Sequence, residues 1–117
     1  MTTLYGIKNC DTVRKACKWL DAHNIKYTFH DVRNDGLDKN DLSAWVKSVG
    51  WESLLNRRST TWRQLPDNDK EGINETNAIQ LMSSQPTLIK RPVLIHNKNI
   101  HVGFKPADYA TVFNQTP

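Results

Sequence analysis

The sequence predicts an α/β fold with a mixed four-stranded sheet, and three patterns along the chain support this prediction. The first third reads as strand, helix, strand, and the end of the chain reads as strand, strand, helix. The middle contains only helical apolar spacings. Because a crossover helix joins parallel strands and a tight turn joins antiparallel ones, one sheet is expected to contain both pairings. From the 117 residues we expect a single domain over 1–117, with a helical insert at about 38–86.

The first third begins with a predicted strand over 3–7. A helix follows, because the apolar residues Val13, Ala16, Cys17 and Leu20 recur at i, i+3, i+4 and i+7. His23 and Asn24 are expected to end it. Apolar and polar residues then alternate over 25–32, which predicts a second strand.

The middle of the chain is predicted to be helical. Asp38 is a candidate N-cap for a helix with an apolar face, and Gly50 is expected to end that helix. A short helical turn is predicted over 51–55. The polar and basic stretch 56–63 is predicted to be a loop, and a further helix is predicted over 77–83.

The last elements are a hairpin and a helix. Two apolar runs over 93–95 and 100–102 flank an Asn-Lys-Asn turn, which indicates a β-hairpin. Pro106 is placed at a helix start, with apolar residues at helical spacing after it. This order of elements is the thioredoxin arrangement with helices inserted in its middle.

Composition excludes several classes of protein. The chain is 38% hydrophobic and 24% charged, as expected of a soluble globular protein. It has no apolar run long enough to cross a membrane and no secretory-type first segment, so we expect no membrane partner and a cytoplasmic location. The net charge is +4, but no basic run or metal-type spacing occurs. We therefore expect no nucleic-acid partner and no metal site. We also expect the protein to be a monomer.

Cys10 is the leading candidate for chemistry. It lies where a predicted strand gives way to a helix, and the first turn of a helix favours an anion. Thiolate is the nucleophilic form of cysteine, and Lys8 and Arg14 add positive charge nearby. The alternative is a structural cysteine in a loop. Its polar neighbours Asn9 and Asp11 favour the reactive interpretation, although Asp11 would partly oppose a thiolate.

The second cysteine, Cys17, is predicted to be a small residue of the helical core. Seven helical residues rise about 10.5 Å, whereas a disulfide requires Cα atoms within roughly 7 Å. A Cys10–Cys17 bridge is therefore not expected. Val13 occupies the place of the second cysteine in a Cys-x-x-Cys pair. An external thiol such as glutathione, or a partner protein, must therefore complete any redox cycle.

Cationic residues elsewhere could hold an anionic group. Arg57 and Arg58 lie in a basic loop, and an arginine fork suits carboxylates and oxyanions. Arg91 precedes Pro92 at the mouth of the hairpin, and Lys105 precedes the last helix. Ordinary solvated side chains are the alternative for the basic loop and for Lys105.

The sequence resembles the arsenate reductase (ArsC)/Spx family, and most of all its YffB-like branch. The resemblance covers nearly the whole chain. It is carried by short motifs at 4–12, 29–31, 35–37, 54–56, 60–63, 89–92 and 103–104, and residues 8–12 of the first motif form the active loop. It implies a thioredoxin-like core with a helical insert.

The resemblance also implies roles for particular residues. Cys10 matches the nucleophilic cysteine of the family. Arg58, or its neighbour Arg57, matches the first of three assisting arginines, Arg91 matches the second, and Lys105 stands in place of the third. Pro92 corresponds to a cis proline. We further expect substrate or glutathione contacts from Lys8, Asn9 and Thr12 of the active loop.

The function implied is that of a glutathione-dependent thiol reductase that uses one nucleophilic cysteine. Glutathione would be a co-substrate rather than a tightly bound cofactor, and glutaredoxin is a candidate partner. Two alternatives stay open. One is an Spx-like module that binds RNA polymerase, although Val13 removes the Spx switch. The other is arsenate reduction itself, which Asp11 disfavours because its charge would face an arsenate dianion.

Overall fold

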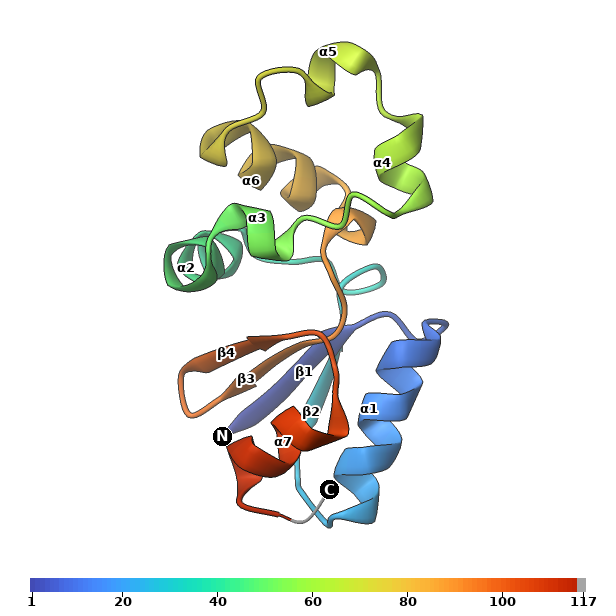
Figure 1. Ribbon diagram of the computed structural model, residues 1–117, viewed down its shortest axis with the longest axis vertical. Helices are drawn as coiled ribbons and strands as arrows, with labels where there is room; N and C mark the ends of the chain where they lie inside the picture. The colour runs from blue at the N-terminus through green and yellow to red at the C-terminus, as the bar shows by residue number, and fades with distance from the viewer. Residues whose placement is uncertain (116–117) are drawn as a thin grey trace. The chain divides into compact units, whose positions relative to one another are not determined.

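The computed structural model describes residues 1–115 and confirms a mixed sheet of four strands with helices (Figure 1). The chain forms two compact units. The first consists of Met1–Asp35 together with the chain from Arg91 onward, and the second is Gly36–Lys90. The second unit contains the segment that was predicted to be a helical insert.

The sheet lies in the first unit and has the strand order β2-β1-β3-β4. Strand β1 (Thr2–Gly6) pairs in parallel with β2 (Thr28–Asp31) and antiparallel with β3 (Val93–His96). Strand β3 pairs antiparallel with β4 (Asn99–Val102), as the hairpin signal predicted. Both kinds of pairing therefore occur in one sheet.

The second strand is shorter than predicted. Apolar alternation suggested a strand over 25–32, but strand pairing begins only at Thr28. The preceding residues form a turn, in which Asn24 has a positive φ of 57° and the Ile25 N–H donates to the Leu20 carbonyl at 3.0 Å. The apolar residues before Thr28 pack against the core instead of pairing with a strand.

Two helices pack on the sheet. Helix α1 (Asp11–Ala22) ends at His23 as predicted, and helix α7 (Pro106–Phe113) has its proline at the first helical position, where no N–H is needed. Val13, Ala16 and Leu20 of the predicted face are buried. Cys17 is only partly buried, and Trp19, which was not part of that face, is buried as well. Periodicity therefore identified these elements correctly.

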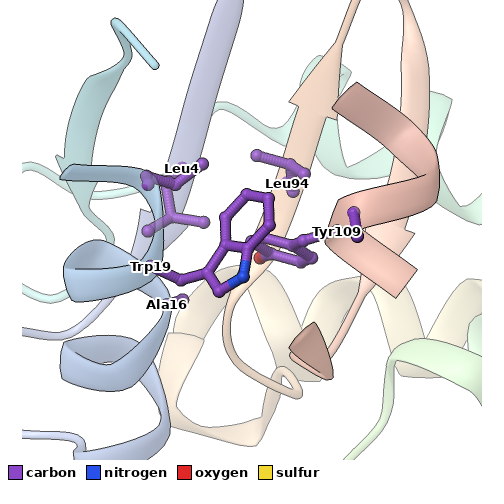
Figure 2. Close-up of a cluster of buried hydrophobic side chains, with 7 residues drawn as sticks. Leu4, Ala16, Trp19, Leu94 and Tyr109 are labelled. Atoms are coloured by element: carbon purple, nitrogen blue, oxygen red, sulfur yellow. The ribbon is translucent and has the colours of Figure 1, made fainter. Parts of the chain in front are cut away.

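The core of this unit forms where α1 and α7 meet one face of the sheet (Figure 2). Leu4 and Leu94 are register partners on β1 and β3, and both are fully buried. Trp19 of α1 meets Tyr109 of α7 edge-on, with ring centroids 5.7 Å apart. This aromatic contact links the helix that begins beside Cys10 to the last helix.

Strand β1 and the first turn of α1 approach each other very closely at Gly6. A Cβ atom at this position would lie 2.8 and 2.9 Å from the two Cγ atoms of Val13. Since real Cβ atoms do not come so close, only glycine lets the helix begin at this distance from the strand. The position of Cys10, which lies between the two elements, depends on this contact.

We expect Gly6→Ala to destabilise the protein by about 1–3 kcal/mol, because the added methyl group overpacks the contact with Val13. Urea unfolding measures this change. In a Val13→Ala background the colliding Cγ atoms are absent, so the same substitution should cost clearly less. An equal cost in both backgrounds would contradict the steric explanation.

The second unit is helical, as predicted for the middle of the chain. Helices α2, α3 and α6 pack together, and apolar residues of all three are buried. The elements of this unit are α2 (Lys39–Val49), α3 (Trp51–Leu54), α4 (Thr60–Gln64), α5 (Asp67–Lys70), α6 (Glu75–Ser84) and a 3₁₀ helix (Pro86–Leu88).

Capping confirms two of the predicted helices and corrects other boundaries. Asp38 caps α2 by accepting from the Asn40 N–H at 2.7 Å, and Gly50 ends it. Helix α6 is longer than predicted, because Asn74 provides an N-cap. The loop predicted over 56–63 is partly helical, since Ser59 caps the short helix α4. Helix α5 was also not predicted, and both helices are too short to show periodicity.

No helix within residues 1–115 is both long enough and apolar enough to cross a bilayer.

Candidate active site

Cys10 immediately precedes helix α1 and occupies its N-cap position. Its backbone is extended, with φ −95° and ψ 124°, and its carbonyl accepts the first helical hydrogen bond, from the Arg14 N–H at 3.0 Å. The side chain is partly exposed and makes no capping hydrogen bond within the described chain. A thiolate here would face the unpaired N–H groups of the first helical turn, which favour an anion.

The loop before Cys10 is held at three points. The Cys10 N–H donates to the Ile7 carbonyl at 3.2 Å. The Lys8 carbonyl accepts from Arg14 Nε at 3.3 Å, and the Lys8 N–H donates to Asp31 Oδ2 at 3.4 Å. These bonds connect the loop to the helix after it and to the end of β2. Cys10 therefore has a defined place although it lies on a loop.

Asp31 is a buried carboxylate that joins this loop to a turn. Its other oxygen, Oδ1, accepts from the N–H groups of Arg33 at 2.9 Å and Asn34 at 3.1 Å. Burial alone would raise the pKa of this carboxyl, but hydrogen bonds from the backbone of Asn34, Arg33 and Lys8 outweigh burial. They hold the pKa of Asp31 below its usual value. The Asp31 carboxylate thus connects the loop before Cys10 to the turn that follows β2.

Asp11 does not cap the helix, because Cys10 holds that position. Its carboxylate instead pairs with the Arg14 guanidinium at 3.1 Å. Both side chains are largely exposed, so the pair contributes little stability. It does direct the negative charge of Asp11 toward a cation, which reduces the repulsion that Asp11 would exert on a thiolate.

Further candidate residues lie in segments that leave the sheet at one end, as the pairing of its strands shows. Tyr5, near the end of β1, pairs with Val93 at the start of β3, and Val93 pairs with Val102 at the end of β4. The segments that leave the sheet at this end contain Cys10, Arg91, Pro92 and Lys105.

The Arg91–Pro92 peptide bond is cis, as the resemblance implied. Pro92 is buried, and its carbonyl accepts from the Gly103 N–H at 2.8 Å. Lys105 is exposed and precedes α7, and its carbonyl accepts from the N–H groups of Asp108 and Tyr109. Lys8, Asn9 and Thr12 of the active loop are exposed.

Arg57 and Arg58 belong to the second unit, and their surroundings differ. The Arg57 guanidinium lies 5.8 Å from the ring centroid of Trp51 and 5.9 Å from that of Trp62. The Arg58 guanidinium has no hydrogen bond or ion pair within residues 1–115. Arg57 is therefore engaged in cation–π contacts, while Arg58 presents its donors to solvent.

The two cysteines are both free thiols, as expected. Cys17 packs partly against the core of the first unit, in agreement with its predicted structural role. The pKa of the neighbouring Tyr27 is raised, mainly by burial and further by the Cys17 thiol and the Asp21 carboxylate.

No cluster of metal-ligating side chains occurs among the residues described.

Sequence reasoning missed Asp31 as a site residue. Asp31 lies in one of the motifs that carry the family resemblance, yet it also accepts a hydrogen bond from the backbone of the active loop. The available signal was a carboxylate at the end of an alternating segment, directly before a predicted turn. Its link to Lys8 depends on the register of β1 against β2, which places Asp31 opposite Gly6 and which no local pattern reveals.

Together, the fold and the Cys10 position define a thioredoxin-like protein with an exposed cysteine at a helix N-terminus. Residues 5–112 match the ArsC family, and the chain belongs to that family.

Several relatives agree with this assignment. An uncharacterized protein of Haemophilus influenzae is 47% identical over 97% of this chain and 99% of its own length. The global transcriptional regulator Spx of Streptococcus mutans is 29% identical over 89% of this chain and 77% of its own.

Two solved structures are also similar. A protein named YffB superposes with a TM-score of 0.92 and 47% identity, covering 95% of this chain and 97% of that one. An arsenate reductase (ArsC) related protein from Brucella melitensis has a TM-score of 0.76 and 49% identity, covering 96% of this chain and 93% of that one. The family thus includes proteins named as regulators and proteins named as reductase-related.

Proposed function

We propose that the protein is a glutathione-dependent thiol reductase with Cys10 as its single nucleophile. The observation that carries this proposal is the position of Cys10, partly exposed at the N-cap of α1 on a loop held at three points. The side chain is accessible to a substrate, and the first turn of the helix offers unpaired backbone N–H groups to an anion at this position.

The reaction is a pair of thiol–disulfide exchanges. The Cys10 thiolate attacks the glutathione sulfur of a mixed disulfide between glutathione and a substrate thiol. A bond forms between Cys10 Sγ and glutathione, the substrate disulfide breaks, and the substrate leaves as a thiolate that takes a proton from solvent. A second glutathione thiolate then attacks the Cys10 adduct, which regenerates Cys10 and releases oxidised glutathione. The net reaction converts one mixed disulfide and one glutathione thiol into the free substrate thiol and oxidised glutathione, so the number of disulfide bonds is conserved.

Cationic side chains would bind the carboxylates of glutathione. Lys8, Arg91 and Lys105 come from segments at the sheet end that contains Cys10. Arg58 has an uncommitted guanidinium, which favours it over Arg57 as the anion-binding member of the basic loop. Asn9 and Thr12 would supply polar contacts from the active loop.

An Spx-like regulator that binds RNA polymerase is the second candidate. The relationship to proteins named as Spx regulators favours it. Val13 disfavours it, because a Cys-x-x-Cys switch would need a cysteine at that position.

A steady-state assay tests the proposal. The purified protein is supplied with glutathione, glutathione reductase, NADPH and a glutathione mixed disulfide of a small thiol, and NADPH consumption is followed. We expect turnover that is saturable in the mixed disulfide. A parallel reaction with arsenate and glutaredoxin tests arsenate reduction. A protein that is inactive in both assays yet retains RNA polymerase from cell extract would instead favour the regulator.

We expect Arg58→Gln to raise the KM for glutathione by about tenfold, because a charge-assisted hydrogen bond contributes about 1.5–3 kcal/mol. Arg57→Gln is the matched control, since it removes the same charge from the neighbouring position. It should leave KM unchanged and lower stability by up to about 1 kcal/mol through lost cation–π contacts. Initial rates and urea unfolding measure the two effects. The reverse pattern would assign Arg57 to the site.

A further inference from the structure

An open pocket of about 310 Å³ lies between helix α1 and strand β2. Its apolar lining consists of Val13 and Cys17 from α1 and Phe29 from β2. Phe29 is the register partner of Leu4, so its side chain lies on the sheet face that α1 covers. The volume lies at the small end of the range for ligand pockets, which begins at about 300 Å³. The space therefore suits a compact apolar group.

Three cations complete the lining of this pocket: Lys8, Arg14 and Lys18. Arg14 and Lys18 are four residues apart on α1 and lie on the same helix face. Asp11 pairs with Arg14 and neutralises part of that charge. Lys8 and Lys18 are exposed and form no ion pair within residues 1–115. An anionic group at the edge of the pocket would thus meet two exposed ammonium groups, of which Lys8 also interacts electrostatically with the Asp31 carboxylate.

We propose that this pocket binds a small organic anion with an apolar body, of the class of medium-chain carboxylates. The apolar body would cover Val13, Cys17 and Phe29, and the carboxylate would contact Lys8 and Lys18. Glutathione fits this pocket poorly, because its peptide backbone would lose hydrogen bonds to water against an apolar floor. The inference concerns binding alone and does not depend on any chemistry at Cys10.

The test is an NMR titration of the ¹⁵N-labelled full chain with octanoate. We expect saturable shifts of amides in the loop containing Lys8, along α1 and at Phe29. Octylamine has the same apolar body with the opposite charge, and acetate has the charge without the body. Neither should produce these shifts, because the site requires both features. Octanoate should also slow alkylation of Cys17 in the Cys10→Ser variant, since the Cys17 side chain lines the pocket.

A pair of lysine variants provides the control. Lys18→Gln should weaken octanoate binding by about tenfold, as expected for loss of one charge-assisted hydrogen bond. Lys15→Gln removes the same charge from the same helix, outside the pocket lining. It should change octanoate binding by less than about twofold, because salt screens a charge that does not contact the carboxylate. Absence of saturable shifts, equal shifts with octylamine, or equal effects of the two variants would overturn the proposal. Shifts produced only by an acidic peptide containing phenylalanine would identify a protein-docking surface instead.

Discussion

Cys10→Ser should reduce glutathione-dependent turnover by on the order of a thousandfold or more. A serine hydroxyl is not ionised near neutral pH and cannot form a disulfide with glutathione. Both steps of the proposed exchange are therefore lost, whatever binding affinity the cationic side chains supply. The steady-state assay with the glutathione mixed disulfide measures this loss. Mass spectrometry of the wild-type protein after exposure to oxidised glutathione should show one glutathione adduct, and the variant should show none at this position.

Cys17→Ala is the matched control for this experiment. Cys17 lies two helical turns further along α1 and packs partly against the core, so it does not share the helix N-terminus with Cys10. Its replacement should leave turnover within about twofold of wild type, at a modest cost in stability from the lost sulfur. If Cys17→Ala abolished turnover while Cys10→Ser retained it, the nucleophile would be wrongly assigned.

The elements that sequence patterns predicted well are those whose determinants are local. The face of α1, the cap at Asp38 and the hairpin turn near Asn97 each depend on residues within one or two turns of chain. The pattern failed where apolar alternation arose from packing, as it did before Thr28. It also failed at α4 and α5, since a helix of one turn leaves too few residues for periodicity to appear.

The features of the candidate site likewise fall into those that local sequence could predict and those that depend on distant residues. The position of Cys10 at the start of a helix could be predicted, because a strand-to-helix transition is visible in local sequence. The distinction between Arg57 and Arg58 could not, since it depends on where two tryptophans place their rings. Asp31 was missed because its partner Lys8 is 23 residues away and is reached only through sheet pairing.

The two carboxylate oxygens of Asp31 accept hydrogen bonds from different segments, so the bond to the active loop can be tested separately from the bonds to the turn. Oδ1 accepts from the turn residues Arg33 and Asn34, while Oδ2 accepts from the Lys8 N–H. In Asp31→Asn the amide oxygen can keep the bonds to the turn. The amide nitrogen then faces the Lys8 N–H, and two donors cannot bond to each other. The substitution therefore breaks the link to the active loop and preserves the turn.

We expect Asp31→Asn to lower stability by about 1–3 kcal/mol at neutral pH, through one lost charge-assisted bond and an unpaired donor. Because the folded state holds the pKa of Asp31 below its usual value, the carboxylate stabilises the protein above its unfolded pKa of about 3.9. This contribution disappears as the pH falls through the lower pKa of the folded state. The stability difference between wild type and variant should therefore be constant above about pH 5 and shrink below about pH 4. Urea unfolding at a series of pH values measures it, and a difference that persists unchanged to pH 3 would show that the ionised carboxylate is not what holds the loop. Turnover provides a second readout, since a loosened loop should slow the attack by Cys10 more than a substitution of equal cost in stability that leaves the three loop bonds intact, such as one in helix α7.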